Sequence, residues 1–302
     1  LRPDGRSLSR VHDSCMAADS PSSCRSPAST RLVDADSKTC AMRELNTLWL
    51  LPVFTSLLCW AACIIPYIIG ASLGHIPAIL PYISDGGAYP PEGCIFSLLL
   101  NASTVMIVLT VVVKHAQFTA FYSTRRLDEW WRAVSRASVF FGGLSAFGLA
   151  MAGNFSEMEE ITVHDIFALV TFVSGLVYLG MISGLSFLRP HLCSPIVAGL
   201  RVAMFIVGLV ALLFHEITLQ FNIFVPGNYT NSDSGTGYQI EFYPPDSPYY
   251  VNHIVATSTE WLLALNTFLF FATFAEEFRK STVYFPRVEM KDAHSLDLSL
   301  KL

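Results

Sequence analysis

The residues of this chain that could carry chemistry are ionisable and amide side chains within or beside long apolar segments. We call the following ten the polar candidates: Asp85, Glu92, Asn101, Asn154, His164, Asp165, His215, Glu216, His253 and Glu260. Such groups are costly to bury in a membrane, so each needs a partner, a wet cavity or a functional role. Three interpretations are open: a hydrogen-bond network between helices, a pocket for lipid headgroups, or a metal or acid–base site.

Familiar catalytic and metal-binding motifs are absent from the sequence. It has no phosphate-binding glycine loop, no nucleophile elbow and no H-E-x-x-H motif. No two histidines lie four residues apart on one helical face, which weakens the case for zinc. We therefore predict no catalytic residue, metal or cofactor, and a regulator rather than an enzyme. The alternative is an intramembrane lipid-modifying enzyme or lipid transporter, whose chemical groups would be Asp85, Glu92, His164, Asp165 and Glu260.

The elements that must position these residues are membrane-spanning helices. Of the 302 residues, 52% are hydrophobic and only 14% charged, whereas soluble domains carry about 25% charged residues. Six apolar runs of roughly 17–26 residues are each long enough to cross the bilayer. They cover about residues 48–70, 94–113, 137–153, 163–188, 202–221 and 253–275. Backbone groups in lipid must be satisfied within the segment, so we predict an all-α membrane protein with six transmembrane helices in one bundle.

The cations predict how the chain is oriented. All 19 Lys and Arg residues fall before the first run, after the last, or in the second and fourth connections. By the positive-inside rule both termini are cytoplasmic. We divide the chain into a disordered cytoplasmic region at 1–46, the transmembrane domain at 47–279 and a cytoplasmic tail at 280–302. The expected partners are membrane lipids, with a membrane protein as a further candidate and no nucleic acid.

Two predictions concern the outer side. The sequon Asn228-Tyr229-Thr230 lies in the longest outer connection, so Asn228 is the predicted glycosylation site. The stretch Leu80–Asn101 is broken by proline and glycine, so we expect either an ordered turn or a loose loop, which would cover the polar candidates from the outer side. Glu260 would be the energetic centre beneath it, about 10 Å into the membrane at 1.5 Å per residue. His164 and Asn101 are its expected partners.

Small residues predict where helices pack closely. Ser138, Gly142, Ala146 and Ala150 recur at intervals of four residues, and Gly180 and Gly184 repeat that spacing in the next run. Stripes of this kind allow two helix backbones to approach each other.

The segment LPYISDGGAYPPEGCIF, from Leu80 to Phe96, resembles a motif of the damage-regulated autophagy modulator (DRAM) family. Further matches follow in order: Gly74-His75-Ile76, Asn154-Phe155, His164-Asp165, Tyr250-Val251-Asn252-His253 and Glu260-Trp261. The resemblance implies a six-helix protein of the Frag/DRAM/Sfk grouping, whose members are associated with autophagy, lysosomal membranes and membrane lipids. The resemblance implies no catalytic residues for this chain. From the resemblance we expect an endolysosomal membrane. The plasma membrane is the alternative, because the sequence has no lysosomal sorting signal.

Overall fold

The computed structural model describes residues 44–45, 47–125, 129–188, 192–227, 240 and 242–284. All of them belong to the compact unit Arg43–Leu302. Three predictions lie wholly or mainly outside the described residues: glycosylation of Asn228, disorder of residues 1–46, of which only 44–45 are described, and the tail at 280–302, of which only 280–284 are described.

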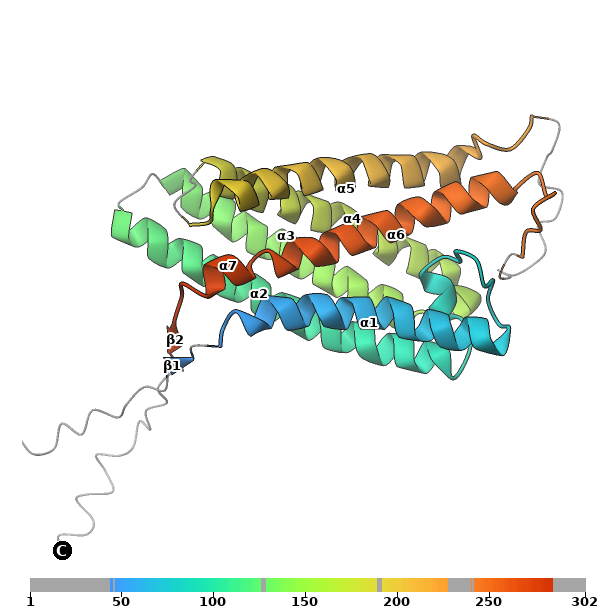
Figure 1. Cartoon of the computed structure of the whole chain (residues 1–302), viewed down its shortest axis with the longest axis horizontal. Helices are drawn as coiled ribbons and strands as arrows, with labels where there is room; N and C mark the ends of the chain where they lie inside the picture. Colours follow the sequence, from blue (N-terminus) through green and yellow to red (C-terminus); the bar gives the residue numbers. More distant parts are fainter. Residues whose placement is uncertain are drawn as a thin grey trace, which may run out of the picture. The chain divides into compact units, whose positions relative to one another are not determined.

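Six helices are long and apolar enough to cross a membrane, which confirms the predicted six-helix bundle (Figure 1). They are α1 (Leu50–Leu73), α2 (Glu92–Arg125), α3 (Glu129–Asn154), α4 (Glu157–Leu188), α5 (Pro195–Phe221) and α6 (Tyr250–Ala272). The short elements are η1 (Ser84–Gly87), α7 (Ala275–Phe278), β1 (Glu44–Leu45) and β2 (Val283–Tyr284). Most helices extend beyond the apolar run that predicted them. Hydropathy marks only the part of a helix that lies in hydrocarbon, whereas helical hydrogen bonding continues into the polar ends.

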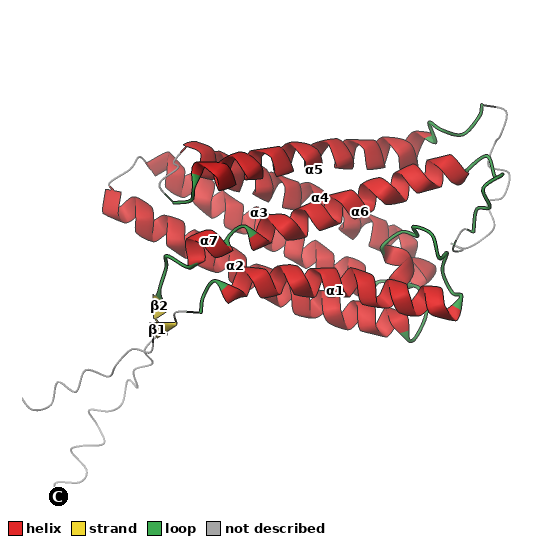
Figure 2. Cartoon of the chain, viewed as in Figure 1, coloured by secondary structure: helices red, strands yellow, loops and turns green. Residues whose placement is uncertain are grey.

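Each helix packs against the next one in the chain, and α6 packs against α1, which closes the bundle. Figure 2 shows that helices make up nearly all of the described chain. The connection from residue 74 to residue 91 lies at one end of the bundle, and β1 and β2 lie at the other (Figure 1). We call these the loop end and the strand end. Because β1 pairs with β2, both limits of the helical unit meet at the strand end.

Local sequence sets two of the helix limits. Gly74 has a φ of 75° and ends α1, a left-handed conformation that glycine adopts without steric cost. Ser194 starts α5: its hydroxyl accepts a hydrogen bond from the Val197 N–H at 3.4 Å, and Pro195 occupies the first helical position.

The small-residue stripe of α3 is a packing face, as predicted. A Cβ atom added at Gly142 would lie 2.9 Å from Val111 of α2 and 3.1 Å from Tyr178 of α4. In α4, Gly180 packs closely against Phe205 of α5, but Gly184 has nothing within 4 Å. The prediction for Gly184 was wrong, because four-residue spacing does not show whether both residues meet a neighbouring helix.

Candidate functional site

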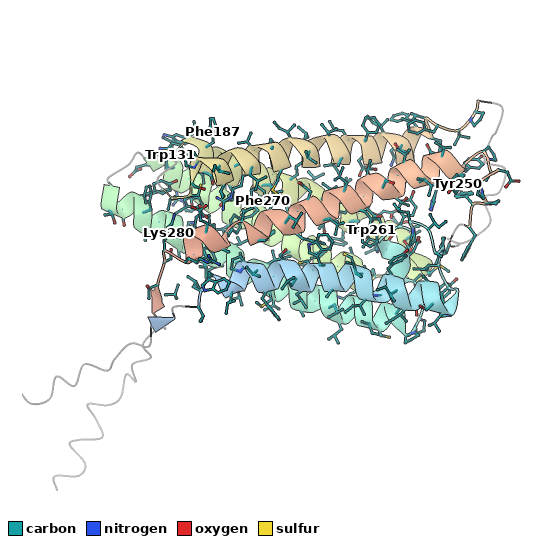
Figure 3. All side chains as sticks on the ribbon, viewed as in Figure 1. Trp131, Phe187, Tyr250, Trp261, Phe270 and Lys280 are labelled. Carbon is teal, nitrogen blue, oxygen red and sulfur yellow. The ribbon has the colours of Figure 1, made fainter. Side chains whose placement is uncertain are left out.

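The connection 74–91 is held on α6 by two adjacent residues. The Trp261 indole Nε1 donates to the carbonyl of Pro81 at 2.9 Å, and the Glu260 carboxylate accepts from the N–H of Ile83 at 3.0 Å. Trp261 lies between α6 and α1 (Figure 3), where its ring meets Tyr67 edge-on at 5.9 Å. The N–H of Tyr82 donates to Asp85 at 2.8 Å. Of the two alternatives for this stretch, the structure shows the ordered turn, and it lies over Glu260.

Two glycines allow this connection to lie close to α2. A Cβ atom at Gly87 would stand 2.7 Å from the Phe96 ring, and one at Gly93 would stand 2.6 Å from the carbonyl oxygen of Gly87. Side chains at these positions would push η1 away from the bundle. The glycines thus help to place Ser84 and Asp85 over the helices.

A buried carboxylic acid that was not among the polar candidates lies beneath η1. Glu157, in the first turn of α4, is 4% exposed and interacts with the side chains of Ser84 and Asp85. The backbone is non-helical at Glu160, so this turn is kinked relative to the rest of α4. The sequence does not distinguish Glu157 from Glu159 and Glu160, since all three are acids at the start of one helix.

Two adjoining cavities extend from the loop end into the interior of the bundle. The first, of about 100 Å³, is mainly apolar and reaches Tyr178 and Phe271 in the bundle interior. The second is more polar, lies between α4, α5 and α6, and is lined by Glu157, Asp165 and Glu216. Residues that line both cavities are Ser84, His164, Ala168, Phe172 and Glu260. We call the two together the shared cavity.

Two of the predicted histidines join helices at this cavity. His164 Nδ1 lies 3.0 Å from the carbonyl of Ala152 and 2.9 Å from that of Phe155, so it donates to the end of α3. His215 Nδ1 lies 3.0 Å from the carbonyl of Ala256 and joins α5 to α6. Both rings are buried, and both line the polar part of the cavity.

His253 differs from the other two histidines. It is buried, and neither ring nitrogen has a hydrogen-bond partner among the described residues. The ring packs edge-on against Tyr82 at 5.1 Å and Tyr243 at 5.4 Å. It therefore helps to seat the 74–91 connection and does not line the shared cavity.

The remaining polar candidates lie elsewhere. Asn101 and Asn154 form a reciprocal amide pair between α2 and α3, with N–O distances of 2.9 and 3.0 Å. Glu92 is fully buried and accepts from His75 at 2.6 Å. That pair brings a histidine and an acid together, but neither residue lines the shared cavity.

The expected partners of Glu260 were wrong. Asn101 bonds to Asn154, and His164 Nδ1 bonds to backbone carbonyls, whereas Glu260 bonds to the N–H of Ile83. Depth along a helix, from which these partners were inferred, does not show which way a side chain points. His164 still faces the same cavity as Glu260.

A second charged site lies at the strand end. Arg201 of α5 and Glu277 of α7 form two hydrogen bonds, Nη1 to Oε1 at 2.9 Å and Nη2 to Oε2 at 3.1 Å. Lys114 of α2 donates to the same carboxylate, and all three side chains are fully buried. We call these three residues the ionic cluster. Such a cluster fixes three helices relative to one another, because each charge needs the others to remain buried.

The sequence analysis assigned Lys114 and Arg201 to the connections between the apolar runs. In the structure both residues lie inside helices and are buried. Arg201 also donates to Thr273 at 2.9 Å and to Ser186 at 2.8 Å. Nearby, burial raises the pKa of the Cys193 thiol in the connection before α5. The closed hydrogen-bonded arrangement of the ionic cluster indicates a structural role.

The shared cavity is the better candidate for function, because it combines an apolar interior with polar groups at one end. Among the described residues no group of three or more His, Cys, Asp or Glu side chains could hold a metal ion. The fold and the cavity together define a six-pass helical membrane protein with an amphipathic cavity.

The chain belongs to the family described as Frag1/DRAM/Sfk1/Cwh43P N-terminal domain, whose model matches residues 47–281. DNA damage-regulated autophagy modulator protein 2 of Rattus norvegicus is 32% identical over 249 residues, or 81% of this chain and 88% of that protein. Protein 1 of the same name from Homo sapiens is 28% identical over 229 residues, or 74% and 87%. Transmembrane protein 150A of Xenopus laevis is 30% identical over 200 residues, or 66% and 62%. No solved structure matches the chain.

The resemblance to the DRAM family is thereby confirmed. The six helices and these relatives establish an integral multi-pass membrane protein of the autophagy-modulator family.

Proposed function

We propose that this chain is a membrane regulator of autophagy that acts by binding a membrane lipid in the shared cavity. The observation that carries the proposal is that the apolar cavity and the polar cavity adjoin, with Ser84, Ala168 and Glu260 lining both. An alkyl chain would occupy the apolar part, and the polar head would lie among the side chains of α4 and α5. Ligand sites commonly combine an apolar lining with a few well-placed polar groups.

The route into the cavity would run through the side of the bundle. The polar part is lined by Ile166 of α4 and Leu219 of α5, whose side chains are 55% and 39% exposed. Exposed apolar residues on a membrane helix face lipid, so a lipid could enter between α4 and α5 without crossing water. The 74–91 connection, bonded to Glu260 and Trp261, would close the cavity at the loop end.

The proposed orientation places the strand end in the cytosol and the loop end in the lumen or outside the cell. The placement of all Lys and Arg residues supports this orientation. The proposed compartment is the endolysosomal membrane, with the plasma membrane as the alternative, and lipid binding would control contacts with a partner membrane protein.

Native mass spectrometry of the purified full chain tests lipid binding. Ala168→Phe should fill the junction between the two parts of the cavity and abolish co-purification of lipid. Ala203→Phe introduces the same side chain on an exposed face of α5 and is the matched control. Lipid binding that persists in folded Ala168→Phe protein would contradict the proposal.

A further inference from the structure

The shared cavity carries an unusual charge balance. Glu157, Asp165, Glu216 and Glu260 line its polar part, and no Lys or Arg does. The sequence has no Lys or Arg in residues 44–113, 137–188 or 202–278, which supply every lining residue. A phosphate head would therefore meet acidic side chains without a cation to offset their repulsion.

Glu157 supplies a second, independent observation. Its side chain is almost completely buried and lines the polar part of the cavity, and its Oε1 atom has no hydrogen-bond partner among the described residues. A buried acceptor without a donor is energetically costly, and the cost is larger for a charged group. Its neighbour Asp85 is a second acid, so what Glu157 lacks is a donor or a positive charge.

We propose that the bound lipid has an amine head, which donates hydrogen bonds and carries a positive charge; this rests on the lipid-binding function proposed above. An ammonium group has three N–H donors, and carboxylates are acceptors that bond strongly to charged donors. The head would lie at Glu157, within the ring of acids from α4, α5 and α6. The alkyl chain would pass Ala168 and Phe172 and extend into the apolar part of the cavity towards Phe271.

Three amphiphiles with the same chain and different heads test the head chemistry. Octadecylamine, octadecanol and octadecyl phosphate are added to the purified full chain in neutral detergent, and the bound fraction is measured by native mass spectrometry. We expect the amine to bind about tenfold more tightly than the alcohol, because a charged donor strengthens its hydrogen bonds to carboxylates. The phosphate should bind most weakly.

Glu157→Gln should lower octadecylamine binding about tenfold and leave octadecanol binding unchanged, since the amide keeps the shape but cannot ionise to pair with an ammonium head. Glu159→Gln removes an exposed acid two residues away and is the matched control. Asp165→Asn is a second variant, at the exposed rim of the cavity, that does not alter the buried acids. It should weaken octadecylamine binding to a smaller extent than Glu157→Gln does.

The outcomes separate the two proposals. If the phosphate binds as well as the amine, or if Glu157→Gln leaves amine binding unchanged, the amine inference is wrong and lipid binding stands. If none of the three amphiphiles binds to folded wild-type protein, or Ala168→Phe weakens none of them, the lipid-binding function is wrong as well.

Discussion

Arg201 and Glu277 form a doubly hydrogen-bonded ion pair in which neither side chain is exposed. The pair joins α5 to α7 across 76 residues of sequence, and Lys114 adds α2 to the same carboxylate. Figure 3 labels Phe270, in the last turn of α6, and Lys280, which follows α7 in the chain. With two cations and one anion, the ionic cluster depends on Glu277 for all of its negative charge.

Glu277→Gln should strongly destabilise the protein, because it leaves Lys114 and Arg201 buried without a counter-charge. Removing one member of a buried ion pair typically costs about 3–5 kcal/mol. The measurement is the thermal unfolding midpoint of purified protein in detergent. Glu276→Gln is the control, since Glu276 is only partly buried and bonds to Ser194 and Lys280. Equal midpoints for the two variants would show that the cluster does not hold the helices together.

Gly142→Ala and Gly143→Ala should differ although the residues are adjacent. A methyl group at Gly142 would collide with Val111 and Tyr178, whereas Gly143 has nothing within 4 Å. Overpacking of this kind costs about 1–3 kcal/mol, and alanine in an exposed helix is favoured over glycine by about 1 kcal/mol. Relative to the wild-type protein, the thermal unfolding midpoint should therefore fall in Gly142→Ala and rise in Gly143→Ala. A stable Gly142→Ala protein would mean that α2 and α3 are farther apart than described.

Trp261→Phe should loosen the 74–91 connection without unfolding the bundle. The substitution keeps an aromatic ring beside Tyr67 but removes the N–H that donates to Pro81, a loss of about 1 kcal/mol. Hydrogen exchange at residues 80–87 should become faster, while exchange in α3 should not change. Tyr67→Phe removes the neighbouring bond to the carbonyl of Ala78 and should affect residues 76–79 instead. Unchanged exchange at 80–87 would show that the indole does not hold the connection.

Glu260→Gln should preserve folding, because the amide oxygen can still accept from the N–H of Ile83. Glu260→Leu should destabilise the protein by about 1–3 kcal/mol, since it leaves that donor without an acceptor. Both variants are compared by thermal unfolding and by lipid occupancy. If Glu260→Leu is as stable as Glu260→Gln, the bond to Ile83 contributes little and the connection is held elsewhere.

Asn228→Gln should remove a glycosidase-sensitive shift in electrophoretic mobility when the full chain is expressed in cells. The acceptor sequence belongs to the connection between α5 and α6. By the orientation rule this connection is outside the cytosol. A glycosylation sequence added at the N-terminus should stay unmodified. Glycan on that added sequence would reverse the proposed orientation.

The sequence by itself determined the number of the membrane-spanning helices and part of their packing. Hydrophobic run length is a local property set by the thickness of the bilayer, so six spans follow from composition alone. Gly142 was identified as a close contact because a small residue matters wherever two backbones approach. Pro81, Gly87 and Gly93 predicted a connection without regular structure, either an ordered turn or a loose loop, although Gly87 lies in η1 and Gly93 in α2.

Only the tertiary structure decided which polar groups meet. Asn101 and Asn154 pair across 53 residues, and Lys114 and Arg201 turn inward to one carboxylate instead of facing solvent. Among three acids at the start of α4, Glu157 alone is buried beneath Asp85, where the helix kinks at Glu160. Each of these contacts depends on the rotation of one helix about its axis relative to another. That rotation is fixed by the packing of all the side chains together, and no single segment of sequence specifies it.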